Sequence, residues 1–157
     1  MEIVVDILEE VENPGLLAMT AERAARLALE MAGAGDQEGE LGIVLAGSQY
    51  VQGLNREYRG EDYDTDVLAF SMREPGEGEP KTELPGDILG DVVVSLPTAA
   101  RQAGEYGHDL ALEVGLLVAH GVLHLLGYRD DTPAGEELMW EKQREVLARL
   151  GGPGAMD

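Results

Sequence analysis

The chain has 157 residues, the size of one ordinary domain, and its 31 acidic and 11 basic side chains give a formal net charge of -20. This balance excludes a generally basic nucleic-acid binder, because phosphate neutralisation requires lysine and arginine, so a polyanionic substrate would need a local positive feature such as a metal ion or a few arginines. The absence of cysteine excludes disulfides, thiolate metal sites and cysteine nucleophiles.

The first sixty residues predict alternating strands and helices. The acidic start lacks the basic region and apolar stretch of a secretory signal, which favours the cytoplasm. Strands are expected over 3–8 and 41–45, where aliphatic residues gather. Helices are predicted from an N-cap at Thr20 to about residue 31, and from an N-cap at Ser48 to about residue 58, because apolar residues recur there at helical spacing.

The middle of the chain predicts two more strands on either side of an acidic loop. The strands are expected over 66–71 and 88–95, and the second contains three consecutive valines. Between them, 73–85 combines proline, glycine and glutamate with few apolar residues, which indicates an exposed loop. A short helix is expected from Pro97, which suits a first helical turn, to about residue 104.

The segment 110–128 is mostly apolar and nearly long enough to span a membrane. It contains three ionisable residues whose insertion into hydrocarbon would be costly, namely Glu113, His120 and His124. We therefore expect a helix buried in a protein core, capped by Asp109 and ending at Gly127, because glycine commonly terminates helices.

A last amphipathic helix is predicted to begin at Thr132 and Pro133. Its expected apolar face comprises Leu138, Met139, Val146, Leu147 and Leu150. Trp140 and Tyr128 are expected to belong to the core. The final residues, 151–157, are predicted to form a disordered tail.

Together these elements predict an α+β fold. We expect a small mixed β-sheet of about four strands, several helices packed on it, and a long central apolar helix that carries two histidines. Strict β-α-β alternation and a glycine-rich loop after a strand are both missing from the sequence, which argues against a doubly wound nucleotide-binding fold. Residues 1–150 are expected to form a single domain.

His120 and His124 are the chemically informative pair. At positions i and i+4 they lie on one helical face, one turn apart, so both imidazoles can reach one metal ion. The alternative is two hydrogen-bonded core histidines, but the surrounding helix is otherwise apolar, and a shared metal would satisfy both rings at once. Gly121 follows His120, so the glutamate base of His-Glu-x-x-His metalloproteases is missing. Its absence argues against peptide hydrolysis as the function.

A third ligand is expected from the turn after the helix. A tight turn at Gly127 would bring Asp130 or Asp131 back beside the histidines. Three protein ligands with an open fourth position are typical of a catalytic zinc site rather than a structural one.

Three motifs resemble those of the YbeY family, the bacterial metal-dependent endoribonucleases that act in ribosomal RNA maturation. The first is HGVLHLLGY over 120–128. The second combines LNREYR over 54–59 with TDVLAF over 65–70, and the third is GDVVVS over 90–95. The motifs occur in the family's order and spacing. With their flanking pattern they cover most of 41–147.

The resemblance also exposes a departure. The family's pattern has a third histidine ten residues after the first, where this chain has Asp130. Aspartate is an accepted zinc ligand, so the implied ligand set is His120, His124 and Asp130, with Asp131 as the fallback. Alternatively, Asp130 only caps the final helix. The implied cofactor is one zinc ion, and an added carboxylate widens the choice toward nickel, manganese or iron.

Arg59 matches the family's arginine, which the resemblance places near the metal. A guanidinium offers a fixed fork of donors to phosphate oxygens, so phosphate binding is the expected role. The alternative is a surface arginine that pairs with Glu61, Asp62 or Asp64.

The resemblance thus implies a cytoplasmic, metal-dependent single-strand endoribonuclease of ribosomal RNA maturation and ribosome quality control. The expected partners are single-stranded precursor ribosomal RNA and the small ribosomal subunit or its proteins, with neither a membrane nor DNA. Two alternatives remain at this point. One is a zinc hydrolase of another substrate, and the other is a non-enzymatic ribosome-assembly factor whose metal is structural.

Overall fold

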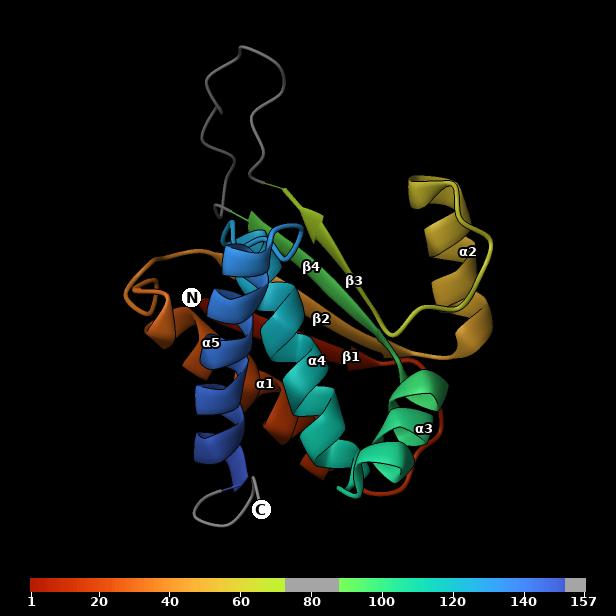
Figure 1. Cartoon of the computed structure of the whole chain (residues 1–157). Helices are drawn as coiled ribbons and strands as arrows, with labels where there is room; N and C mark the ends of the chain where they lie inside the picture. Colours follow the sequence, from red (N-terminus) through yellow and green to blue (C-terminus); the bar gives the residue numbers. More distant parts are fainter. Residues whose placement is uncertain (73–87, 152–157) are drawn as a thin grey trace.

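The computed structural model describes residues 1–72 and 88–151 (Figure 1). The predicted loop over 73–85 and the predicted tail beyond Gly151 lie outside these residues. The strands are β1 (Glu2–Ile7), β2 (Glu40–Ala46), β3 (Val67–Ser71) and β4 (Ile88–Ser95). The helices are α1 (Pro14–Met31), α2 (Ser48–Arg59), α3 (Leu96–Tyr106), α4 (Leu110–Leu125) and α5 (Pro133–Gly151).

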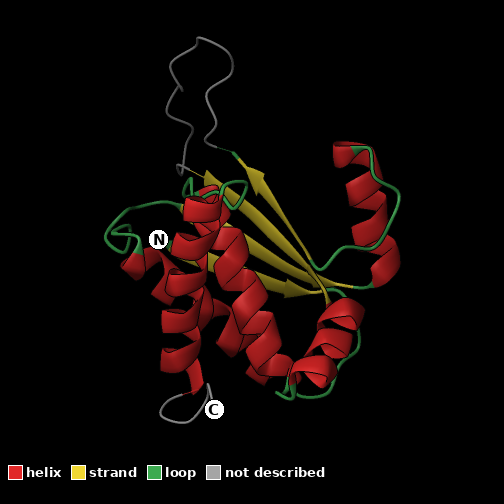
Figure 2. Cartoon of the chain, viewed as in Figure 1, coloured by secondary structure: helices red, strands yellow, loops and turns green. Residues whose placement is uncertain are grey.

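Within the described residues the strands form one mixed sheet in the order β1-β2-β4-β3, which confirms the predicted α+β fold. β1, β2 and β4 run parallel, and β3 pairs antiparallel with β4. Successive side chains of a strand point to opposite faces. Val92 and Val94 accordingly belong to the main core beneath α1, α4 and α5, whereas Val93 packs with Val51 of α2 on the other face (Figure 2).

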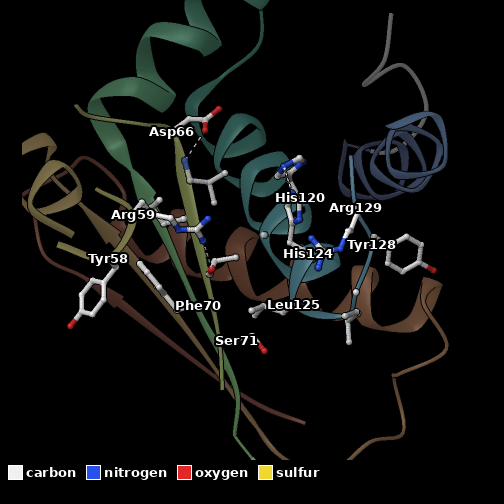
Figure 3. Close-up of a pocket in the computed structure, with 16 residues that line it drawn as sticks. Tyr58, Arg59, Asp66, Phe70, Ser71, His120, His124, Leu125, Tyr128 and Arg129 are labelled. Carbon is white, nitrogen blue, oxygen red and sulfur yellow. Dashed lines mark hydrogen bonds between the residues drawn. The ribbon is translucent and has the colours of Figure 1, made fainter. Parts of the chain in front are cut away.

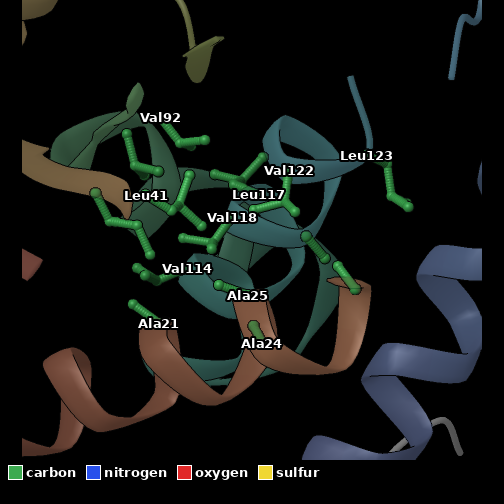
Figure 4. Packing of buried hydrophobic residues seen from close by; sticks show 14 of the residues in the cluster. Ala21, Ala24, Ala25, Leu41, Val92, Val114, Leu117, Val118, Val122 and Leu123 are labelled. Atoms are coloured by element: carbon green, nitrogen blue, oxygen red, sulfur yellow. The ribbon is translucent and has the colours of Figure 1, made fainter. Parts of the chain in front are cut away.

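α4 is the central element of the main core, as its apolar sequence predicted. It packs against β3 and β4 on one side and against α1 on the other, and small residues of α1 such as Ala21 and Ala24 allow the two helices to approach closely (Figure 4). On the sheet side, a Cβ at Gly121 would lie 2.6 Å from a methyl group of Val92. Glycine at this position therefore lets α4 approach β4, which fixes the height of the two histidines above the sheet.

Two predictions about helix boundaries need correction. α1 begins at Pro14, six residues before the predicted cap Thr20, because a proline in the first turn is compatible with a helix start and Leu17 is buried against the core. Ser48 is the first residue of α2, and Gly47 occupies the N-cap position. The predicted cap Asp109 is correct, since its carboxylate accepts a hydrogen bond from the Leu112 amide at 3.1 Å.

The expected apolar face of α5 is partly wrong. Met139, Val146 and Leu147 are buried as predicted, but Leu138 is 44% exposed and Trp140 is 50% exposed. Residues on either side of Met139 are rotated by about 100° around a helix, so they cannot share its core-facing direction. Among the described residues no single helix is long and apolar enough to cross a membrane; only α3 and α4, bent by 112°, pass that test together.

Candidate metal centre

The C-terminal end of α4 turns the chain back toward its own last turn. Gly127 has a φ of 101°, a left-handed conformation that glycine adopts without strain. Its amide donates to the His124 carbonyl, and the Tyr128 amide donates to the Leu123 carbonyl, both at 3.0 Å. This pair of bonds is the Schellman motif, and it reverses the chain direction as predicted for a terminal glycine.

The returning segment is held against the start of α5. The Thr132 hydroxyl accepts a hydrogen bond from the Gly135 amide at 3.1 Å, so it caps α5 as expected of a threonine before the helix. A Cβ at Gly135 would lie 2.3 Å from the carbonyl oxygen of Arg129. Glycine therefore permits a close approach that fixes the residues between Arg129 and Thr132, including Asp130.

The three predicted ligand side chains lie together. The Nε2 atoms of His120 and His124 are 3.1 Å apart, and one Asp130 carboxylate oxygen lies 3.7 Å from each of them. Tetrahedral zinc with bonds of about 2.0–2.1 Å would separate two donor atoms by about 3.3 Å. The donor types and spacing thus fit a small divalent metal. Asp131, the fallback, is not a member of this group.

The surroundings of His124 favour its neutral imidazole. Burial lowers the pKa of His124 below its usual value, and the neighbouring His120 lowers it further, while the Asp130 carboxylate acts in the opposite direction. Gln143 Oε1 lies 2.8 Å from His120 Nδ1, the ring nitrogen on the side away from His124. Sequence reasoning missed Gln143; the available signal was an amide on the core-facing side of α5, between Met139 and Val146.

The histidines form one wall of a pocket of about 830 Å³, and Arg59 lies on the opposite wall (Figure 3). Arg59 ends α2, and its guanidinium donates to the carbonyl of Ala69 on β3 at 2.8 Å. The same guanidinium lies 5.8 Å from the ring centroid of Phe70. Asp62, one of the acids considered as its partner, instead lies 3.4 Å from Arg56.

Asp66 and His108 have local roles. Asp66 accepts a hydrogen bond from the Val67 amide at 2.8 Å, where β3 begins. His108 lies 2.5 Å from the buried Glu113 and is therefore the partner of that carboxylate. Arg129, which the sequence reasoning assigned no function, also lines the pocket.

The fold and these side chains define a class: a small α+β protein in which two histidines at the end of a central helix lie beside an aspartate and face an arginine across a pocket. A model of the family described as Endoribonuclease YbeY matches residues 9–151, and the chain belongs to that family. It is 43% identical to an Endoribonuclease YbeY of Desulforamulus reducens over 149 residues, which are 95% of this chain and 96% of that protein.

Further similarities agree with this family. The chain is 50% identical to an Endoribonuclease YbeY of Pelotomaculum thermopropionicum over 132 residues, covering 82% of each protein. The solution structure of TM1509 from Thermotoga maritima superposes with a TM-score of 0.61 at 25% identity, covering 98% of this chain and 95% of that one. The family resemblance inferred from the three motifs is therefore confirmed.

Proposed function

We propose that this protein is a metal-dependent single-strand endoribonuclease that acts in ribosomal RNA maturation and ribosome quality control. The observation that carries the proposal is the convergence of His120, His124 and Asp130, with the two histidines opposite Arg59 in one pocket, in a chain from the Endoribonuclease YbeY family. A zinc hydrolase of another substrate and a purely structural metal are not favoured, because the relatives are named as endoribonucleases and the pocket leaves the donor set accessible.

In this proposal His120, His124 and Asp130 hold one metal ion, with zinc as the first candidate and nickel, manganese or iron as alternatives. Their side chains are 25%, 33% and 44% exposed, so the donor set is open to a substrate. A bound metal supplies Lewis-acid chemistry, which makes water more acidic and withdraws charge from phosphoryl oxygens. The histidines contribute neutral donors, and Asp130 contributes a negative charge.

Arg59 binds the scissile phosphate in the same proposal. Its hydrogen bond to the Ala69 carbonyl fixes the orientation of the guanidinium, which leaves other N–H groups available to phosphate oxygens. These donors would stabilise the charge that develops on the phosphoryl group. Arg129 adds a second cation to the pocket, so RNA meets a local positive field despite the net charge of -20.

The wider setting of the proposal is cytoplasmic. We infer that residues 1–150 act as one catalytic domain, with single-stranded precursor ribosomal RNA as substrate and the small ribosomal subunit or its proteins as partner. Neither DNA nor a membrane has a role in this proposal. The acidic surface is suited to docking on basic ribosomal proteins, while the pocket supplies the contact with phosphate.

The test is cleavage of single-stranded RNA with and without a chelator. We expect cleavage by the purified protein, its loss on chelation, and its return when zinc, nickel or manganese is added. His124→Ala should abolish cleavage, and His108→Gln serves as the matched control because His108 pairs with Glu113 rather than with the other histidines. Cleavage that persists in a chelator or in the His124→Ala variant would refute the metal-dependent mechanism.

A further inference from the structure

Gln143 is a buried amide that reaches the candidate metal centre from a different helix. Its side chain projects from the core-facing side of α5, and the residue is only 8% exposed. Oε1 lies 2.8 Å from Nδ1 of His120, whereas Nε2 of the same ring faces His124 at 3.1 Å. The two nitrogens of His120 therefore have distinct environments, one toward the protein interior and one toward the pocket.

This geometry favours one of the two neutral tautomers of His120. A neutral imidazole has one N–H donor and one lone pair, and an amide oxygen can only accept. Nδ1 must therefore be protonated to bond with Gln143, which leaves the lone pair on Nε2. That lone pair lies on the nitrogen that is close to the other two donors, His124 Nε2 and the Asp130 carboxylate, so it is available to a metal bound between them. The opposite tautomer would direct an N–H into the pocket and could not bind a metal there.

We propose that Gln143 is a positioning residue that fixes His120 in the Nδ1–H tautomer and holds its ring, so that Nε2 is ready to bind the metal. The inference rests on the metal centre of the proposed function, but not on any activity toward RNA. Partners of this kind both orient a ligating histidine and raise its basicity, and their loss typically weakens metal affinity by about 10- to 100-fold.

The first measurement needs no substitution. The protonation site of each imidazole is read from two-dimensional ¹⁵N–¹H NMR spectra of metal-free protein at about pH 8.5, well above the usual histidine pKa of about 6.5. The chain has three histidines, so assignment by single substitution is direct. We expect the proton of His120 on Nδ1. A proton found mainly on Nε2 would overturn the proposal, whatever the variants below do.

Two substitutions of Gln143 then distinguish the contribution of its carbonyl oxygen as a hydrogen-bond acceptor from that of its size and shape. Gln143→Met keeps the length but lacks the carbonyl oxygen, so His120 should shift toward Nε2–H and zinc affinity should fall by about 10- to 100-fold. Gln143→Glu keeps an acceptor and should retain the Nδ1–H tautomer, with zinc affinity within a few-fold of the parent. Affinity is measured by competition with a chromogenic chelator, and circular dichroism identifies the folded variants that are compared.

Gln52→Met is the matched control, because it removes an amide whose partner is the exposed Asp62, away from the centre. It should change neither the tautomer nor the affinity. If Gln143→Met leaves both unchanged, or shifts the tautomer without weakening zinc, Gln143 does not position the ligand. If the parent protein binds no zinc while His120 is still Nδ1–H, the metal site of the proposed function fails and the tautomer assignment stands.

Discussion

The two walls of the pocket are built in different ways. The metal-side wall is the end of α4, where ten of sixteen residues are buried, so the histidine positions follow from packing in the core. The arginine wall is the end of α2, where only Val51 and Asn55 of twelve residues are buried. Its geometry depends on polar contacts, including a hydrogen bond from Asn55 Nδ2 to the Tyr63 carbonyl at 3.0 Å and that of Arg59 to Ala69.

Because of this difference, substitutions in the two walls should affect different properties of the protein. Changes on the α4 side should alter metal binding and folding together, because the two histidines project from a helix that is otherwise packed into the core. Changes on the α2 side should alter contact with the substrate and leave folding nearly intact, because surface substitutions usually change stability by less than about 0.5 kcal/mol.

The largest expected effect is on the arginine wall. Arg59→Ala should reduce RNA cleavage by about 100- to 1000-fold, the usual result of removing a donor that stabilises developing charge. Metal content and melting temperature should not change, and both are measured on the same preparation. Arg56→Ala is the control, because Arg56 lies on the same helix and pairs with Asp62. Loss of metal in the Arg59 variant would show that the two walls are not separable.

The identity of the third ligand tests the metal-side wall. Asp130→Ala should weaken zinc binding by about 100-fold or more. This is a larger effect than the loss of a residue that only positions a ligand, which typically weakens metal affinity by about 10- to 100-fold. Asp131→Ala should have little effect, since Asp131 lies outside the donor group. Asp130→His should retain zinc. Chelator competition compares all three variants, and loss of zinc in the Asp131 variant would place the ligand one residue later.

Substitution of one glycine in each helix compares how tightly α4 and α2 are packed. Gly121→Ala in α4 should destabilise the protein by about 1–3 kcal/mol, because its Cβ would lie 2.6 Å from Val92. Gly53→Ala in α2 has nothing within 4 Å of its Cβ and should instead stabilise by about 0.5–1 kcal/mol through helix propensity. Chemical denaturation measures both. Equal effects would show that α4 is no more tightly packed than α2.

The smallest effect expected is a pH dependence of the metal-free protein. Burial lowers the pKa of His124 in the folded state, so the unfolded state binds its proton more readily. The stability linked to the neutral His124 imidazole is fully present above its unfolded-state pKa of about 6.5. It is lost as the pH falls from there through the lower folded-state pKa. His124→Gln should lose less stability than the parent over this interval. The free energy of unfolding of both proteins is measured by urea denaturation across this pH interval. An equal loss of stability in the two would exclude His124 as the cause.

The sequence predicted best what depends on local spacing. The helical face shared by His120 and His124, the turn at Gly127 and the return of Asp130 all lie within one helix end, where periodicity and glycine chemistry determine the geometry. Their action as ligands remains a prediction. Gln143 was missed because its contact with His120 joins two helices, and neither helix alone indicates the other's orientation. Trp140 was misplaced because its apolar character outweighed its angular position on α5.

The turn at Gly127 also bears on how the site assembles during folding. The three donors span only residues 120–130, so bringing them together closes a very short loop and loses little chain entropy. The arginine wall joins α4 only when segments some sixty residues apart meet, at a greater entropic cost. The donor cluster is therefore a low-contact-order feature that can form with its own helix, whereas the pocket depends on the completed sheet.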